Sequence, residues 1–244
     1  MTAPLWVVVP AYNEQARISA TLAALAAQTD TDFTLLVVDN NSTDGTAEVV
    51  RRFEAPFPVE LLVETDKGVG CAVDTGFRHA IAAGAVHLAR TDADCLPAPG
   101  WVAAARAALA SGGAMACGKI TARADEHGPV GRGFFRLLVV LAAAFGRVRP
   151  AHRTAEFKAP YRMHAGNNMA ITAELYLACG GMPRRPSPTD RTFLNRVRRT
   201  TADIVHSRDM VVANSTRRIR AYGVVGTAKW YLDRGSGPRT ADPR

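Results

Sequence analysis

Two carboxylates stand one residue apart, at Asp92 and Asp94, directly after a short apolar segment at residues 85–89. Side chains at such spacing beyond the end of a strand can converge on one cation once the chain turns. Hard cations such as Mg²⁺ and Mn²⁺ prefer carboxylate oxygens and often share their coordination with phosphates. The pair therefore indicates a clamp for a metal ion and a diphosphate. A polar turn before a helix that begins near Pro99 would produce the same pattern.

The elements that must position these carboxylates follow from apolar periodicity. Continuous apolar segments predict buried strands, and amphipathic segments between them predict helices; the expected strands are 5–9, 33–38, 59–63 and 85–89. This alternation predicts a parallel sheet covered on both faces. Ligands bind such sheets at the carboxyl ends of the strands. Loops 10–14, 39–45 and 91–95 all leave those ends, so we expect their polar residues on one edge.

The second half of the chain carries weaker signals. The pattern predicts helices at 99–110 and 134–145, a helix beginning at Thr189-Asp190, and strands at 115–121 and 210–213. Residues 166–171 lead into a short helix that Gly180-Gly181 closes. Residues 122–132 and 147–160 are expected to be loops, and residues 235–244 have the composition of a tail.

Composition narrows the classes of function. Among 244 residues, 30 are Lys or Arg and 22 are Asp or Glu, which gives a net charge of +8. This balance favours anionic partners such as nucleotides, phospholipid surfaces or nucleic acid. The four cysteines form no Cys-x-x-Cys pair, which argues against a zinc knuckle and for reduced thiols in a cytosolic protein. The first residues lack the pattern of a signal peptide.

Five segments occur in order: Val7–Glu14 (VVVPAYNE), Val37–Thr46 (VVDNNSTDGT), Asp92–Asp94 (DAD), Gly180–Met182 (GGM), and Thr189-Asp190 before an amphipathic helix. This ordered set resembles the family-2 glycosyltransferases over roughly residues 5–225. The resemblance implies the GT-A fold, a Rossmann-like, doubly wound, mostly parallel sheet flanked by helices in a single domain. It also implies a nucleotide-diphosphate sugar donor, a divalent metal (Mn or Mg) and inversion at the anomeric carbon. It does not imply binding to nucleic acid.

The resemblance assigns roles to individual residues. Asp190 is the expected catalytic base, and Asp94 with Asp92 the expected metal ligands; the residues expected to bind the nucleotide sugar are Pro10, Ala11, Tyr12, Glu14, Asp39, Lys67, Asp92 and Asp94. Asn167, Asn168 and Arg217 are expected on the acceptor side. The family usually has Glu-Asp at 189–190, whereas this chain has Thr189, which puts the binding of the acceptor in doubt more than the reaction.

Each assignment has a structural alternative. Asp39 can cap its own turn, Tyr12 can pack within its loop, and Asp190 can simply favour the start of a helix. Glu14 can play the same part at the helix that follows it. Lys67 and the glycines after it suit a phosphate at a helix start, but they also suit a solvated turn. Gly166–Asn168 can be a plain turn, Arg217 can belong to a solvated face, and His164 and His206 can be metal ligands or not.

The apolar run from Phe134 to Phe145 is followed by Arg147, Arg149, His152 and Arg153. An apolar segment beside basic residues suits an anionic lipid surface, and would make the protein a peripheral one at the inner face of a membrane. Because the run is apolar almost all round, the pattern favours a core helix packed on the sheet. The run is also shorter than the ~20 residues that a bilayer requires.

We therefore expect a GT-A domain over residues 1–232, with a nucleotide-sugar-binding half at 1–121, an acceptor-side half at 122–232 and a flexible tail at 233–244. The expected function is transfer of one sugar, with a UDP-sugar as the first candidate donor, to an acceptor hydroxyl or a lipid-linked acceptor. The alternatives are a nucleotide-sugar-binding protein without activity and a sugar nucleotidyltransferase. The latter needs a glycine-rich loop after the first strand, where this chain has Pro10–Glu14. The sequence leaves the oligomeric state open.

Overall fold

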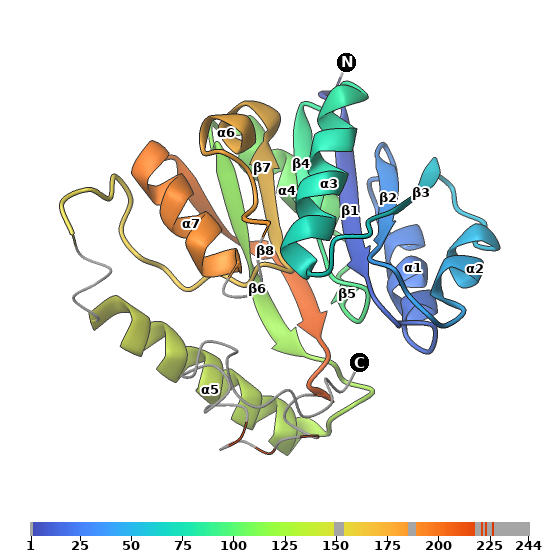
Figure 1. Ribbon diagram of the computed structural model, residues 1–244. Helices are drawn as coiled ribbons and strands as arrows, with labels where there is room; N and C mark the ends of the chain where they lie inside the picture. Colours follow the sequence, from blue (N-terminus) through green and yellow to red (C-terminus); the bar gives the residue numbers. More distant parts are fainter. Residues whose placement is uncertain are drawn as a thin grey trace.

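The computed structural model describes residues 2–148, 154–184 and 189–217, together with residues 221, 223 and 226. Within them, one mixed sheet has the strand order β3-β2-β1-β4-β7-β6-β8-β5 (Figure 1). The strands are β1 (Leu5–Ala11), β2 (Thr34–Asp39), β3 (Val59–Val63), β4 (His87–Arg90), β5 (Leu96–Pro97), β6 (Met115–Ala122), β7 (Met169–Thr172) and β8 (Ile204–Asn214). The helices are α1 (Ile18–Ala26), α2 (Thr46–Arg51), α3 (Val69–Ala82), α4 (Trp101–Ala110), α5 (Pro129–Val148), α6 (Ala173–Ala178) and α7 (Thr189–Thr200).

The first four strands confirm the predicted parallel arrangement. β1 pairs in parallel with both β2 and β4, and β2 pairs in parallel with β3. The register sets Ala11 opposite Asp39, so the loops after β1 and β2 leave the sheet at the same level. β7 is antiparallel to both β4 and β6, and β6 is parallel to β8. The carboxyl ends of β1, β2, β4, β6 and β8 therefore share one edge of the sheet.

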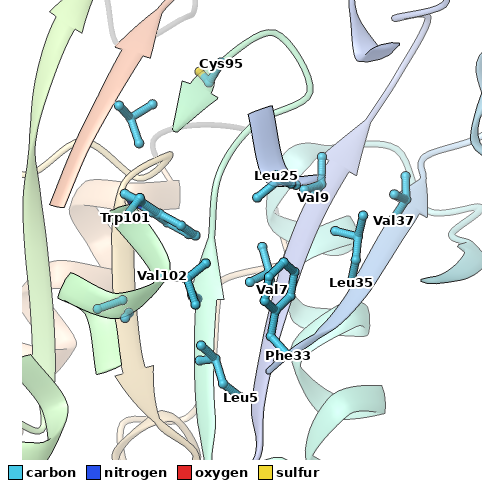
Figure 2. Packing of buried hydrophobic residues seen from close by; sticks show 14 of the residues in the cluster. Leu5, Val7, Val9, Leu25, Phe33, Leu35, Val37, Cys95, Trp101 and Val102 are labelled. Carbon is cyan, nitrogen blue, oxygen red and sulfur yellow. The ribbon is translucent and has the colours of Figure 1, made fainter. Parts of the chain in front are cut away.

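Burial on both faces explains the continuous apolar sequence of β1. Val7 and Val9 point into a core shared with α1, α2 and α4, whereas Trp6 and Val8 point into a core shared with α3, α6 and α7. Figure 2 shows the first of these cores, where β1, β2 and α4 meet. Since successive side chains of a strand point to opposite faces, a strand covered on both sides is apolar throughout. The two cores hold the edge that carries the polar loops.

The second half departs from the prediction in three places. Residues 169–172 form strand β7 before α6 begins, because they pair with β4 on one side and β6 on the other. β8 begins at Ile204, earlier than the predicted 210, and α5 begins at Pro129 inside a predicted loop. The predicted tail at 233–244 lies outside the described residues. Short apolar segments have no periodicity of their own that separates strand from helix, so long-range pairing decides.

Helix α5 is not a core helix, and the prediction that favoured one is wrong. Gly146 is its only buried residue, and large apolar side chains along it are exposed. Figure 1 shows α5 lying across the end of β6, apart from the helices that cover the sheet. At 20 residues, α5 is also long and apolar enough to cross a membrane by length and composition alone. The predicted apolar run is shorter because it leaves out residues 129–133 and 146–148.

Candidate functional site

The predicted nucleotide side is built from the loops that follow β1, β2 and β3. Pro10 and Ala11 are buried in the last part of β1, and Asp39 is buried at the end of β2, where its Oδ1 accepts a hydrogen bond from the Ser42 amide at 3.1 Å. Tyr12 follows Ala11, and the Lys67 Nζ lies 5.2 Å from the centre of its ring. An aromatic ring, a carboxylate and an amine thus stand together at one edge, a combination suited to a base, a ribose and a phosphate.

Asn40 is a residue of this region that sequence reasoning missed. Its side-chain Nδ2 donates to the carbonyls of Glu64 and Asp66 at 2.9 and 2.8 Å, and its Oδ1 accepts from the Gly68 amide at 2.7 Å. Asn40 therefore ties the loop after β2 to the segment that carries Lys67. An Asn beside Asp39 was visible in the sequence, but its partners 24 to 28 residues away were not.

Arg90 is the second residue that was missed, and it joins the two halves of the site. It ends β4 and is 1% exposed. Its guanidinium donates to Asp92 Oδ1 at 3.0 Å and to Asp190 Oδ1 at 2.8 Å. The predicted metal ligand and the predicted base, far apart in the sequence, are therefore held by one cation. A charged residue within a buried strand was the available signal, because such a charge requires a partner.

The charges of this cluster shift its titration. Burial raises the pKa of Asp92, and the neighbouring Asp94 and Asp190 raise it further, while Arg90 opposes the shift. Burial would lower the pKa of Arg90, but Asp92 and Asp190 outweigh burial and raise it. Arg90 is therefore a permanent cation, and the carboxylates around it repel one another. Such a site favours a further cation over a further anion.

A second guanidinium bridges the carboxylates on the nucleotide side. Arg217 donates to Glu14 Oε2 at 2.8 Å, and its Nη2 lies 3.0 Å from Asp94 Oδ2. Glu14 is buried, and burial raises its pKa although Arg217 opposes the shift. The Glu14 amide donates to Thr46 Oγ1 at 2.8 Å, which fixes the loop against α2. The structure thus places Arg217 beside Glu14 and Asp94, two residues that were expected to bind the nucleotide sugar.

The segment before β7 lies directly against the predicted base. A Cβ atom added at Gly166 would lie 2.2 Å from the Asp190 Cγ, so only glycine permits this approach. Asn167 donates to the Cys95 Sγ at 3.2 Å, and its Oδ1 is buried with no hydrogen-bond partner among the described residues. Both ring nitrogens of His164 and the Thr91 hydroxyl are in the same situation. Unpartnered buried polar atoms in the segments next to Asp92 and Gly166 suit a polar ligand or water.

Asn168 differs from Asn167. Its side chain is fully buried, accepts a hydrogen bond from Trp101 Nε1 at 2.8 Å, and donates to the carbonyls of Lys119 and Met210 at 2.9 and 3.0 Å. These bonds connect the start of β7 to α4, β6 and β8. The structure therefore gives the Asn168 side chain a structural part, and no atom of it remains for an acceptor.

The donor set around Asp94 suits a divalent cation that is shared with a ligand. Four carboxyl groups lie within hydrogen-bond distance of two guanidinium groups, so negative charge is in excess among these six side chains. The carboxyl groups belong to Glu14, Asp92, Asp94 and Asp190, and the guanidinium groups to Arg90 and Arg217. Among the described residues, no group of three His, Cys, Asp or Glu side chains converges tightly enough to hold a metal alone. The Arg217 guanidinium against Asp94 shows that this carboxylate accepts a cation. The residues therefore fit a metal whose remaining oxygen ligands come from a diphosphate and water.

His164 gives this site a measurable effect on stability. Burial lowers the pKa of His164 to about 4 from an ordinary 6.5, so the folded protein holds the ring neutral. The stabilisation is complete above pH 6.5 and is lost as the pH falls towards 4, because the unfolded chain takes up the proton first. Between about pH 7.5 and 5, we expect protonation of His164 to cost the parent protein about 1–3 kcal/mol of unfolding free energy. His164→Gln should abolish this part of the loss.

Urea denaturation at the two pH values checks this expectation. His79 on α3, whose side chain is 40% exposed, provides the control His79→Gln. If the variant at position 164 loses as much stability at the lower pH as the parent does, then His164 is not held neutral by the fold.

Comparison with known proteins gives the site a context. Glycosyltransferase AglE of Haloferax volcanii is 38% identical over 100 residues, which cover 39% of this chain and 32% of that protein. Validoxylamine A glucosyltransferase of Streptomyces hygroscopicus is 38% identical over 110 residues, covering 43% of this chain and 24% of that protein. The matched regions thus span about a third or less of these relatives.

Solved structures share the fold over nearly the whole chain. The mannosyltransferase PcManGT of Pyrobaculum calidifontis, in complex with GDP-Man and Mn²⁺, superposes with a TM-score of 0.66 at 24% identity, covering 98% of this chain and 66% of that one. Residues 1–349 of S. aureus TarS, in complex with UDP-GlcNAc, superpose with a TM-score of 0.64 at 16% identity, covering 88% of this chain and 59% of that one. These likenesses show the GT-A fold.

The sequence profile of glycosyl transferase family 2 matches residues 6–164. That region runs from β1 to the segment before β7 and contains Asp39, Asp92 and Asp94; Asp190 lies beyond it. Because the match covers well over half of the 244 residues, the chain belongs to glycosyl transferase family 2.

Proposed function

We propose that this chain transfers a single sugar from a nucleotide-diphosphate sugar to an acceptor hydroxyl, with inversion at the anomeric carbon. The observation that carries the proposal is Arg90, which holds Asp92 and Asp190 at 3.0 and 2.8 Å. A carboxylate suited to the donor and a carboxylate suited to a base are thus held a few ångströms from the same cation. Family membership and nucleotide sugars bound to neighbours of the same fold support the donor class.

In the proposed reaction, the Asp190 carboxylate accepts the proton of the acceptor hydroxyl while the hydroxyl oxygen attacks C1 of the sugar. The bond from C1 to the diphosphate breaks on the opposite face, which inverts the configuration. Arg90 fixes one oxygen of Asp190 and so orients the carboxylate. Arg217 lies beside Asp94 and can move its positive charge onto the diphosphate as the leaving group forms.

A divalent metal, Mn²⁺ or Mg²⁺, fits this site, with Asp94 and Asp92 as its protein ligands. When bound, such an ion stabilises the negative charge that develops on the leaving diphosphate. The neighbour that contains GDP-Man also contains Mn²⁺. In this proposal Arg217 and the metal would compete for Asp94, so the ion pair of Arg217 with Asp94 would open in the complex with donor and metal.

Calorimetry of nucleotide binding tests the role of Asp94. We expect UDP or GDP to bind more tightly with Mn²⁺ or Mg²⁺ than with EDTA, and Asp94→Ala to abolish the difference. Asp209, an exposed carboxylate in β8 outside the site, provides the control Asp209→Ala. Equal affinity with metal and with EDTA would contradict a metal-assisted donor site.

Turnover of a panel of UDP-, GDP- and TDP-sugars tests the enzymatic proposal itself. Release of the nucleoside diphosphate in the presence of an acceptor supports sugar transfer, whereas release of pyrophosphate from a nucleoside triphosphate and a sugar phosphate would indicate a nucleotidyltransferase. Tight binding of a nucleotide sugar with no turnover of any donor would indicate a binding protein. The four carboxylates Asp39, Asp92, Asp94 and Asp190 are all present, which favours activity.

A further inference from the structure

Helix α5 carries a stripe of apolar side chains that faces away from the protein. Exposed residues recur at intervals of three and four, which is the spacing of one helical face: Val130, Phe134, Leu137, Leu141, Phe145 and Val148. Leu137 and Leu141, at the middle of the stripe, are 52% and 56% exposed. This stripe is the largest run of exposed apolar side chains along any described helix, and such runs mark contact surfaces.

The opposite face of α5 is the one that contacts the protein. Phe135, Leu138 and Val139 are less exposed than the stripe, and Gly146 is buried. A Cβ atom added at Gly146 would lie 2.3 Å from the Tyr161 ring, so the helix is in close contact there. The apolar stripe is therefore presented outward by a helix that is held on its other side.

The charges on helix α5 itself are all positive. Residues 129–148 include Arg132, Arg136 and Arg147 and no Asp or Glu. Near the C-terminal end of α5, a hollow of about 510 Å³ is lined by Arg147, Arg162 and Arg198, and none of the described residues that line it is acidic. Apolar side chains on a helix whose only charged residues are arginines are complementary to an anionic lipid surface, in which acyl chains lie beneath negative headgroups.

The positions of the arginines favour a helix that lies in the surface over one that crosses the bilayer. Arg136 and Arg147 are about eleven residues apart, which corresponds to about 16 Å along a helix. The hydrocarbon core of a bilayer is about 30 Å thick, so a spanning helix would place at least one guanidinium within it. In the plane of the surface, the exposed Arg132 and Arg136 can reach the headgroups.

The helix also lies on the side of the molecule where the candidate site opens. β6 and β8 run towards α5, and their carboxyl ends share the sheet edge with those of β1, β2 and β4 (Figure 1). A surface in contact with α5 would therefore lie near the same edge of the sheet, formed by the carboxyl ends of the strands, as Asp92 and Asp190.

We propose that α5 docks this protein onto an anionic phospholipid surface, with the stripe inserted among the acyl chains and the arginines at the headgroups. The proposal rests on the exposed stripe and its charges and does not depend on sugar transfer. It is independent of the donor, because neither Leu137 nor Leu141 belongs to the nucleotide side.

Co-sedimentation with vesicles tests the proposal with the whole chain. At low salt, we expect the protein to pellet with vesicles that contain phosphatidylglycerol and to remain in solution with vesicles of phosphatidylcholine alone. Leu137→Glu combined with Leu141→Glu should lower the partition coefficient at least about tenfold, because it places charge in the inserted stripe. Leu177→Glu combined with Val86→Glu, at exposed apolar positions elsewhere, adds the same charge and should leave partition unchanged.

Three results would overturn the proposal. The first is protein that stays in the supernatant with anionic vesicles at low salt. The second is an equal loss of binding in both double variants, which would assign binding to net charge alone. The third is a change caused by the stripe variant in the absence of vesicles. A fall in unfolding temperature would mean that the chain itself covers the stripe, and a change from dimer to monomer would mean that a second copy covers it.

Discussion

Replacement of Asp190 by Asn is expected to lower the rate of sugar transfer by about 10²–10⁴-fold while donor affinity and fold are preserved. The amide cannot take up the proton of the acceptor hydroxyl. It keeps an oxygen at the position that accepts the Arg90 hydrogen bond of 2.8 Å, so the start of α7 and its contact with β4 should persist. The measurement is kcat with the donor and acceptor found in the panel, together with calorimetric donor affinity.

Asp209→Asn provides the matched control, because Asp209 is an exposed carboxylate in β8 that lies outside the site. We expect it to leave both kcat and donor affinity unchanged. Near-parental transfer by the Asp190 variant would show that Asp190 serves only the start of the helix. If donor affinity and transfer fall together in the Asp190 variant, Asp190 takes part in donor binding instead.

Replacement of Arg90 by Met is expected to reduce transfer by about 10–10²-fold through misplacement of Asp190. Met replaces the apolar part of the Arg side chain but has no guanidinium to hold the two carboxylates, and the loss of a buried pair should also cost about 1–3 kcal/mol of stability. Because Asp92 and Asp190 are each partly exposed, water can solvate them once Arg90 is gone, which limits that cost. Urea denaturation and kcat measure the two effects.

The pH profile separates a positioning role of Arg90 from a purely structural one. Arg90 opposes the raised pKa of Asp92, so its removal should raise that pKa further. Asp92 must be ionised to bind a metal, so donor affinity should fall as the pH drops and Asp92 is protonated. In Arg90→Met this fall in affinity (the acid limb of the pH profile) should occur at higher pH. Arg90→Lys keeps the charge and should restore the limb, although one ammonium cannot reproduce both hydrogen bonds. If the pH dependence of donor binding is the same in Arg90→Met as in the parent, the role of Arg90 is purely structural.

The sequence alone determined the parallel half of this protein. Strands β1, β2 and β4 are covered on both faces, and such burial produces continuous apolar segments in the chain, of which Leu5–Val9 is an example. Each of these strands ends in a short polar loop, and parallel strands present their carboxyl ends at one edge. The clustering of Tyr12, Asp39 and Asp92 at that edge therefore follows from the sequence pattern. The ordered motifs also identified the fold.

Tertiary structure decided the features that depend on distant partners. Arg90 could be recognised as unusual, but its pairing with Asp190 depends on α7 returning to β4 across 100 residues. Asn167 and Asn168 are adjacent and alike in sequence, yet only the placement of β7 between β4 and β6 buries one of them completely. Helix α5 is the clearest case, because its apolar sequence favoured a core helix, whereas most of its large apolar side chains are exposed. The rest of the protein contacts one side of that helix, and only this contact shows which side chains face outward.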